Sequence, residues 1–438
     1  PMKKEKNNSP PSGTRDFLPR ELHRRRQAAG ILAGRFERHG FLPVETPALE
    51  RIQTLTGVYG DEGDKLIFKI LPRGQQAELN PQPDLALRYD LTVPAVRALA
   101  EHDLLQKGFR RYQIGPVWRA ERAARGRFRE FWQCDVDLYN TPTPLAEAET
   151  VAALEGGLRD LGMRELVISV NTRGILRKLC DLFKISEAQR KAVLIALDKL
   201  DKFPIPSVRR EIAAIPCSGA RLLADALHPE FAAELLDKDT LDGPERDELA
   251  EITEAVAAAA SRDLEISVNP LLARGLDYYT GFIFEFHTLG GSTRAIAAGG
   301  RYDNLAAEVA GSDCRICGGS IGLERVLDEL EVQDSISALD PPADDVVHLT
   351  LFSPEMLVAT EQLARELRDL GLKVYVSRGG KIGDQFKAAE RAGHRRCLIY
   401  GPDEEEKAVV TLKDLETGAQ SEVSISDLAG LVEILKGI

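Results

Sequence analysis

The stretch RRYQIGPVWRAERAARGRFREFWQCDVDLY, residues 110–139, contains two strand-like segments separated by a loop of arginine, alanine and glycine. Aromatic and β-branched residues are frequent at 109–118 and 131–139, which predicts two strands. Side chains on a strand alternate between its two faces. We therefore expect Arg119 and Glu121 to leave the first strand on one shared face.

The second strand repeats this arrangement. Arg127 and Arg129 enter it with the same alternation, and Phe131 follows two residues later. A face of arginines, a carboxylate and an aromatic ring suits a nucleotide, because guanidinium groups match phosphate oxygens and a ring can stack on a base. A charged edge hairpin without a ligand is the alternative, which the flanking apolar residues Val117 and Trp118 disfavour.

Composition indicates a globular protein of two or three domains. The chain has 438 residues, 43% of them hydrophobic and 29% charged. No apolar run reaches the ~20 residues that span a bilayer, and no signal-peptide pattern opens the sequence. Six scattered cysteines favour a reducing compartment, so we expect a cytoplasmic protein without membrane partners.

The net charge of −12 opposes general coating of nucleic acid, but two segments are locally basic. Residues 107–129 carry eight lysines and arginines against one acid, and residues 378–396 carry six against two. Two basic segments on an acidic protein suggest specific anionic partners. Two solvated faces are the alternative interpretation.

Periodicity divides the chain further. Helical spacing at 20–39 is followed by an extended, proline-containing segment, FLPVETPALE, at 41–50. Residues 173–262 are helical in period throughout, which predicts an inserted helical module. The stretch 332–345 has the composition of a linker, and strand and helix signals alternate from 346 to 438, as in an α/β domain.

Several segments resemble the histidyl-tRNA synthetase family. The hairpin resembles the second signature motif of class II aminoacyl-tRNA synthetases in the form typical of this family. Further likenesses are found in GTRDFLP (13–19), RYDLTVP (88–94, the amino-acid-binding strand), LARGLDYYTGFIFEF (272–286), AAGGRYDNL (297–305) and GGSIGLERVL (318–327, motif 3). The resemblance extends from residue 13 to residue 438.

The resemblance implies a fold and a division into domains. The expected fold is α+β, with a class II antiparallel-sheet core at 13–172 and 263–331, the helical module at 173–262, and an α/β anticodon-binding domain at 346–438. A disordered tail (1–12) precedes the core, and a linker (332–345) follows it. A homodimer is implied, with the motif 1 region at the subunit interface.

The resemblance also implies the reaction, in which histidine and ATP form histidyl-adenylate and histidine then passes to the 3′ end of tRNA(His). Mg²⁺ would accompany ATP, and no other metal or organic cofactor is expected. Arg119 and Arg325 would bracket the phosphates, with Arg127 near the γ-phosphate. Glu121 would bind the adenine amine and Phe131 would stack on the ring.

Histidine would be bound by residues from three of these segments. Asp90, Leu91, Thr92 and Gln133 would form the ammonium side of the pocket. Asp137 and Tyr279 would meet the two imidazole nitrogens, with Tyr278 as the adjacent wall. Arg274, a catalytic residue with Arg119 and Arg325, would contact both the carboxylate and the α-phosphate.

The expected tRNA contacts are Arg122, Arg125, Lys381 and Lys387. The helical module would lean over the acceptor end, although it could also be scaffold alone. The loop at 122–126 has few polar side chains where many relatives carry amides or lysine. Dependence on the extra 5′ guanosine of tRNA(His) is therefore open.

Two other functions fit part of the pattern. A regulatory paralogue would bind histidine without charging tRNA, but such proteins usually lose parts of the histidine motifs and the C-terminal domain. A tRNA sensor would be fused to a kinase, and no kinase pattern occurs here. The CxxC at Cys314–Cys317 lacks a second cysteine pair for zinc, so packing is the preferred interpretation.

Overall fold

The structure is a computed structural model that describes residues 8–72, 82–124, 126–200, 203–237, 241–274, 278–290, 294–341 and 346–436. The chain forms two compact units, Pro1–Leu339 (unit 1) and Asp340–Ile438 (unit 2). No helix in these described ranges is long and apolar enough to cross a membrane.

Unit 1 is built on an eight-stranded sheet in the order β1-β5-β6-β11-β10-β9-β7-β8. Its strands are β1 (Leu42–Pro43), β5 (Arg110–Trp118), β6 (Glu130–Tyr139), β7 (Leu166–Thr172), β8 (Glu265–Val268), β9 (Phe282–Thr288), β10 (Ala297–Arg301) and β11 (Ile316–Gly322). All pairs are antiparallel except β1–β5 and β7–β8. The predicted α+β class with an antiparallel-dominated core is confirmed.

Two helices pack together beside this sheet, α1 (Pro19–Arg38) and α6 (Leu145–Asp160). Leu32 and Phe36 of α1 are fully buried. A Cβ atom on Gly157 of α6 would lie 2.8 Å from the side chain of Leu32, so glycine is needed where the two helices meet. This packing holds α6 against β11 at the centre of the sheet.

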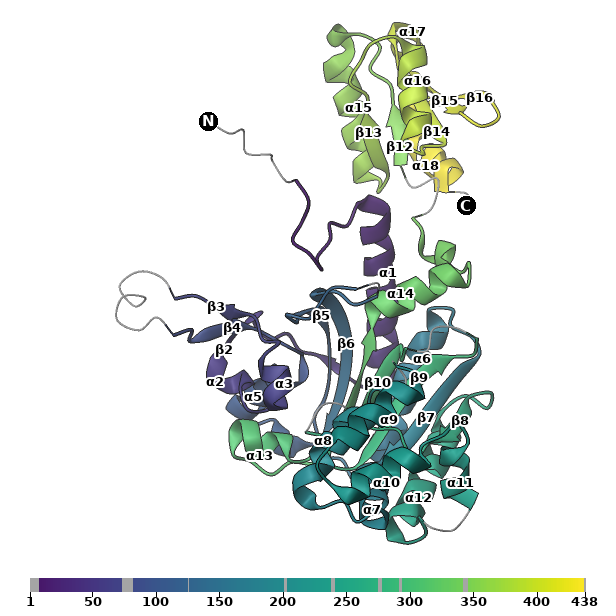
Figure 1. The fold of residues 1–438 in the computed structure, drawn as a ribbon. Coiled ribbons are helices and arrows are strands. Elements are labelled where there is room, and N and C mark those ends of the chain that lie inside the picture. Colours follow the sequence, from purple (N-terminus) through teal and green to yellow (C-terminus); the bar gives the residue numbers. More distant parts are fainter. Residues whose placement is uncertain are drawn as a thin grey trace, which may run out of the picture. The chain divides into compact units, whose positions relative to one another are not determined.

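The module between β7 and β8 is helical, as predicted. It contains α7 (Arg173–Leu182), α8 (Glu187–Leu197), α9 (Ile205–Ala214), α10 (Ser218–Ala226), α11 (Phe231–Asp237) and α12 (Pro244–Ala259). The Thr172 hydroxyl at the end of β7 accepts the backbone N–H of Ile175 at 3.2 Å and so caps α7. Figure 1 shows these helices gathered beside β7 and β8.

A smaller sheet, β2-β4-β3, lies in the N-terminal part of unit 1. Its elements and neighbours are β2 (Leu49–Arg51), α2 (Ile52–Leu55), α3 (Gly60–Asp64), β3 (Lys69–Ile70), β4 (Leu85–Leu87), α5 (Thr92–Glu101), η1 (Leu105–Lys107) and α13 (Leu305–Ala310). The extended segment after α1 contributes only the two residues of β1 to the main sheet.

The expectation of a strand through RYDLTVP was wrong. Strand β4 ends at Leu87, and α5 begins at Thr92. The Asp90 carboxylate accepts the backbone N–H of Val93 at 3.0 Å, which satisfies a donor at the start of the helix. Asp90 therefore stands in the turn between strand and helix.

The core of unit 1 continues into α14 (Leu323–Val332) and η2 (Ile336–Leu339). Unit 2 contains a five-stranded sheet in the order β13-β12-β14-β15-β16. Its elements are β12 (Val346–Leu349), η3 (Pro354–Met356), α15 (Leu357–Asp369), β13 (Lys373–Val376), α16 (Ile382–Arg391), β14 (Arg396–Ile399), α17 (Pro402–Glu406), β15 (Val409–Asp414), β16 (Gln420–Ser424), η4 (Ile425–Asp427) and α18 (Leu428–Lys436). The predicted alternation of strands and helices is confirmed.

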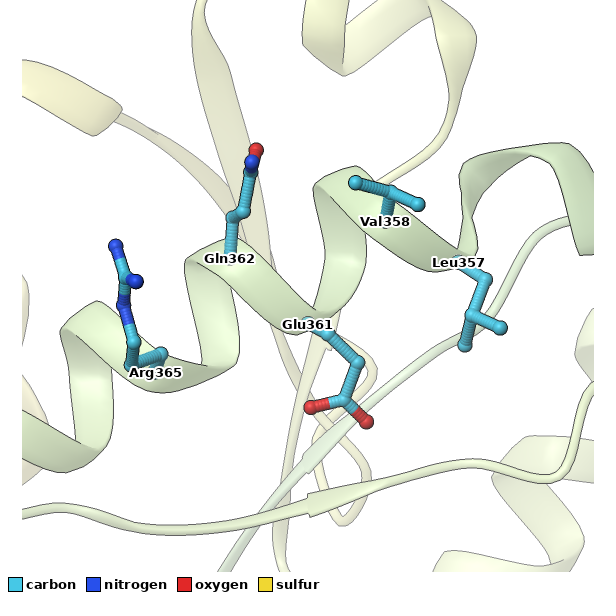
Figure 2. Close-up of a pocket in the computed structure, with 5 residues that line it drawn as sticks. All are labelled: Leu357, Val358, Glu361, Gln362 and Arg365. Atoms are coloured by element: carbon cyan, nitrogen blue, oxygen red, sulfur yellow. The ribbon is translucent and has the colours of Figure 1, made fainter.

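A hollow of about 400 Å³ lies on α15 in unit 2, lined by Leu357, Val358, Glu361, Gln362 and Arg365. Figure 2 shows that these five side chains come from successive turns of the one helix. All five lining residues belong to α15, so we assign no ligand to this hollow.

Candidate active site

Strands β5 and β6 form the predicted hairpin, and their pairing is regular up to its open end. Val117 pairs with Phe131, and the Arg119 N–H donates to the Arg129 carbonyl at 2.9 Å. The carboxylate of Glu121 contacts the guanidinium of Arg127, while the Arg129 side chain donates to the Glu121 carbonyl at 2.8 Å. Regular pairing ends at Trp118 and Glu130, so these charged residues stand in a structured loop.

Arg119 is held beside two aromatic rings. Its guanidinium carbon lies 4.3 Å from the ring centre of Tyr89 and 5.1 Å from that of Phe131. Its Nε donates to the Tyr89 carbonyl at 3.1 Å. These contacts fix the position of the charge while the rest of the guanidinium keeps donors for a ligand.

Several arginines converge on one site. Arg325 on α14 donates to the Ala295 carbonyl at 2.7 Å. Its pKa is lowered by burial and by the positive charges of Arg274, Arg119 and Arg294. Cations from different elements that face one another are stabilised by an anion, so this cluster fits a polyphosphate.

The strand-to-helix turn at Asp90 forms a buried acidic corner. Asp90 Oδ1 accepts the Tyr59 hydroxyl at 3.0 Å, and its buried Oδ2 has no hydrogen-bond partner among the described residues. The same is true of Gln133 Oε1, whose amide nitrogen donates to the Ser320 hydroxyl at 3.1 Å. Two buried acceptors without donors suit an ammonium group. Thr92 is buried beside them and donates to Asp135 at 3.4 Å.

Leu91 offers the expected histidine site no free polar group. Its side chain is fully buried, and its carbonyl accepts a hydrogen bond from Arg111 at 3.1 Å. Only its backbone is polar here, and that oxygen already has a donor.

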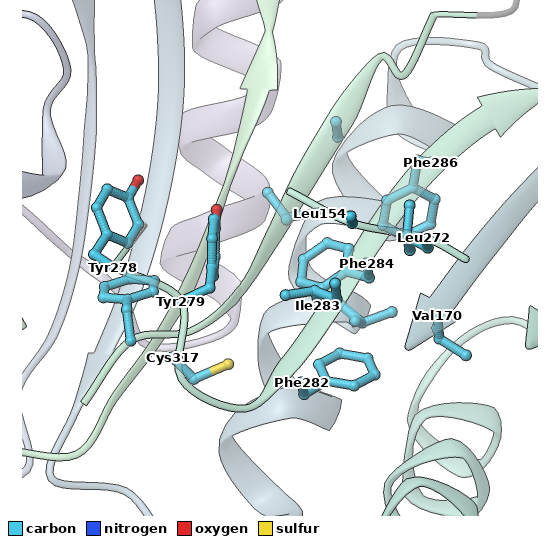
Figure 3. Close-up of a cluster of buried hydrophobic side chains, with 14 of the residues drawn as sticks. Leu154, Val170, Leu272, Tyr278, Tyr279, Phe282, Ile283, Phe284, Phe286 and Cys317 are labelled. Atoms are coloured by element: carbon cyan, nitrogen blue, oxygen red, sulfur yellow. The ribbon is translucent and has the colours of Figure 1, made fainter. Parts of the chain in front are cut away.

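Asp137 lies at the end of a buried network that the sequence did not reveal. Its carboxylate contacts the Arg111 guanidinium and accepts the Tyr302 hydroxyl. The rings of Tyr278 and Tyr279 stand 5.4 and 5.9 Å from that of Tyr302. Figure 3 shows the Tyr278 and Tyr279 hydroxyl groups directed to the same side.

Arg274 contacts the carboxylate of Glu285 on β9. The second oxygen of Glu285 lies 3.5 Å from His287 Nε2. Although burial opposes ionisation, Arg274 and His287 lower the pKa of Glu285 to about 2. A charged Glu285 therefore anchors the Arg274 guanidinium, whose buried Nε has no partner among the described residues.

A cavity of about 220 Å³ adjoins this ion pair. Glu285 lies on its wall, together with Asp198 and Ile205 from the helical module and Asn269 and Leu272 from the segment after β8. The module therefore approaches the Arg274 region directly.

The predicted tRNA contacts are dispersed. Arg122 is exposed in the hairpin loop of unit 1, and Lys381 and Lys387 are exposed at α16 of unit 2. Arg125 lies outside the described residues. Both cysteines of the CxxC are buried thiols, and Cys317 accepts the Thr150 hydroxyl at 3.7 Å, which is consistent with packing.

Sequence reasoning missed Arg111, Glu285, Tyr302 and Tyr59. Two of them carried a usable signal. A glutamate within the apolar strand FIFEF and an arginine inside a strand otherwise facing the core are each unfavourable unless a buried partner is present. Tyr59 and Tyr302 gave no such signal, because tyrosine is common in cores.

The fold and this site, with its arginine cluster beside a buried acidic pocket, define a class of ATP-dependent enzymes that activate an amino acid. Comparison with known proteins specifies the class. Residues 13–326 match the histidyl-tRNA synthetase family and residues 346–434 an anticodon-binding domain family. The chain belongs to the histidyl-tRNA synthetase family.

Relatives and solved structures agree. The chain is 33% identical to a histidine–tRNA ligase of Gloeobacter violaceus, over 96% of this chain and 97% of that protein. It is 35% identical to one of Leifsonia xyli, over 86% and 93%. The crystal structure of histidyl-tRNA synthetase from Nostoc sp. PCC 7120 covers 98% of this chain and 99% of its own, with 29% identity and a TM-score of 0.75.

A structure titled as an ATP phosphoribosyltransferase regulatory subunit/histidyl-tRNA synthetase from Bacillus halodurans shares the fold, at 22% identity and a TM-score of 0.70. The predicted enzyme class and function are confirmed by the family and its near full-length relatives: the chain charges tRNA(His) with histidine, using ATP. The roles of single residues stay predictions.

Proposed function

We propose that histidyl-adenylate forms between the arginine cluster and the buried acidic pocket of unit 1. The observation that carries this proposal is that Arg119 and Arg274, from two other segments, lie near enough to Arg325 for their charges to lower its pKa. They adjoin a pocket whose buried acceptors, Asp90 Oδ2 and Gln133 Oε1, have no partner in the described chain. Such a site holds a triphosphate and an ammonium at once.

In this assignment ATP lies on the hairpin. Arg119 and Arg325 bind the phosphates from two sides, and Arg127 adds charge at the γ-phosphate. Glu121 accepts from the adenine amine, and Phe131 stacks on the base. The support is geometric, because Arg119 is already placed over Phe131 and Glu121 is held in the same loop.

Replacing Phe131 with alanine is expected to raise the KM for ATP about 10- to 100-fold, since base stacking on an aromatic side chain contributes ~1–3 kcal/mol. The KM for histidine should change little. Steady-state ATP–pyrophosphate exchange measures both constants. Phe131→Tyr, which keeps a ring, is the matched control; an unchanged KM for ATP in Phe131→Ala would remove the residue from the adenine site.

Histidine occupies the acidic pocket. Its ammonium lies at Asp90, Thr92 and Gln133, and its ring meets Asp137 and Tyr279, one accepting and one donating. An analogue without a ring N–H leaves Asp137 unpaired, which gives discrimination by a buried polar group. Tyr278 forms the wall through its contact with the Tyr279 ring, 4.9 Å between centres.

The reaction is an in-line attack of the histidine carboxylate on the α-phosphate, and pyrophosphate leaves. Positioning and charge neutralisation dominate such a transfer. Arg274 serves both by touching the carboxylate and the α-phosphate. Mg²⁺, which prefers oxygen ligands and retains water, would accompany ATP and supply positive charge that neutralises the phosphates. Glu121 and Glu285 are the carboxylates of this region that would hold the hydrated ion, and each also contacts an arginine.

We assign the domains as the sequence suggested, with a catalytic core at 13–172 and 263–331, the helical module at 173–262, the linker at 332–345 and the tRNA anticodon domain at 346–438. The chain acts as a homodimer through the region of α1 and β1, where Leu42 of β1 remains 54% exposed. Sedimentation tests this dimer. The six free cysteines support a cytoplasmic location.

The double variant Lys381→Ala/Lys387→Ala should weaken the binding of tRNA(His) and leave adenylate formation unchanged. Each lost phosphate contact lowers the salt slope of binding by about 0.7–0.9. We expect the KM for tRNA to rise roughly 5- to 30-fold with histidine-dependent exchange unchanged. Aminoacylation at several salt concentrations measures this, and Lys407→Ala, an exposed lysine paired with Glu422, is the control.

Exchange assays with each of the 20 amino acids, followed by charging of tRNA(His), test the proposed function. Exchange with histidine alone, and charging, are expected. Histidine binding without exchange in the folded protein would support a regulatory role instead.

A further inference from the structure

The buried guanidinium of Arg111 is the most unusual charge in unit 1. Arg111 is the second residue of β5, which is the strand next to the edge strand β1, and it is fully inaccessible to solvent. Its Nη2 donates to the Leu91 carbonyl at 3.1 Å and contacts Asp137, while Asp135 lies 4.0 Å away. A buried charge is costly unless it is paired, and this one is paired with the residue assigned to the imidazole.

We propose that Arg111 is a positioning residue that neutralises Asp137 and thereby makes the pocket select histidine with a neutral imidazole ring. The proposal rests on the assignment of Asp137 to the ring. A buried carboxylate without a cation would attract imidazolium, which carries a positive charge and two N–H donors. Paired with Arg111, the same carboxylate is a neutral unit that accepts one N–H.

The groups around this pair are consistent with that role. Asp135 and Tyr139 flank Asp137 on β6. Tyr302, which follows β10, donates to Asp137, and Tyr278 packs on Tyr302. Asp90 faces the pocket from the turn before α5. Burial raises the pKa of Asp135 to about 7. Asp135 thus loses its charge near neutrality and leaves Arg111 paired chiefly with Asp137.

The hydrogen bonds also indicate that Asp137 is a charged acceptor, which matches a neutral imidazole ring. Burial raises the pKa of Asp137, whereas Arg111 and Tyr302 oppose that rise by favouring its charged form. Since Tyr302 donates to Asp137, its hydroxyl proton is already used. Asp137 is then an acceptor, and the second ring nitrogen requires a donor such as Tyr279, which matches neutral imidazole.

The test compares histidine with 1,2,4-triazolylalanine, a near-isosteric analogue whose ring stays neutral from pH 5.5 to 7.5. Exchange assays give the KM for histidine divided by the KM for the analogue, which we call the KM ratio. The titration of Asp135 cancels in this ratio because it affects both substrates. In the unmodified protein the ratio should rise about tenfold from pH 7.5 to 5.5, following the imidazole pKa of ~6.5.

In Arg111→Met the ratio should stay flat or fall as the pH drops, and the KM for histidine at pH 7.5 should rise more than kcat falls. Arg111→Lys, which keeps the charge, should restore the rise. A ratio in Arg111→Met that rises as in the unmodified protein overturns the proposal, whatever the KM.

Two further variants isolate the cause. Arg25→Met removes another buried arginine, paired with Glu324 at 2.6 Å, and should reduce thermal stability without changing the pH dependence of the ratio. Asp137→Asn tests the pocket itself. An unchanged KM for histidine in Asp137→Asn would refute the assignment of Asp137 to the imidazole ring. If that KM rises but the ratio of KM values in Arg111→Met depends on pH as in the unmodified protein, only the role of Arg111 is refuted.

Discussion

Arg274→Ala should lose histidine-dependent ATP–pyrophosphate exchange by about three orders of magnitude or more, while histidine still binds. Removing a preorganised charge that stabilises the transition state typically costs 10²–10³ in kcat. Arg274 is also proposed to place the carboxylate for attack, and misplacement adds a further loss. Single-turnover adenylate formation and equilibrium dialysis of histidine separate chemistry from binding. Near-normal exchange would contradict the assignment.

The Glu285 contact complicates this variant and provides its control. Removing Arg274 leaves a buried carboxylate whose remaining ion-pair partner among the described residues is His287, and an uncompensated buried charge destabilises the fold. Arg274→Ala/Glu285→Gln removes that penalty. We expect the double variant to regain thermal stability but not exchange; regained exchange would show that Arg274 acts only by holding Glu285.

The elements with strong local patterns were predictable. Helix 20–39 and strands 109–118 and 131–139 appear within one residue as α1, β5 and β6. Their periodicity is sustained over many residues, so tertiary contacts reinforce it rather than compete with it. The chemistry of the hairpin followed from alternation along its strands, although Arg119 and Glu121 lie just beyond the paired residues.

Short elements and buried partners were not predictable in the same way. Asp90 lies in the turn between β4 and α5 and accepts the backbone N–H of Val93, which strand propensity alone does not reveal. The contacts of Arg111 with Asp137 and of Arg274 with Glu285 join residues on different elements, and the identity of a partner depends on sheet register. Register is set by the whole sheet, not by either residue.

One consequence of that register concerns Gly318. On β11 it pairs with Asp137 of β6 and with Gly300 of β10. A Cβ atom at Gly318 would collide with the Asp137 carboxylate, the Tyr302 hydroxyl and the Val136 carbonyl. The space that glycine leaves is therefore the space in which Asp137 and Tyr302 meet.

Gly318→Ala should accordingly raise the KM for histidine by about 100-fold or more and destabilise unit 1 by ~1–3 kcal/mol, the usual cost of overpacking. The KM for ATP should change much less, because the hairpin is not displaced. Exchange kinetics and thermal unfolding measure these effects. The matched control is Gly383→Ala in α16, where an added Cβ meets nothing within 4 Å. If Gly318→Ala left the KM for histidine unchanged, the Asp137–Tyr302 contact would not shape the pocket, because no backbone shift large enough to admit the methyl group could leave both side chains in place.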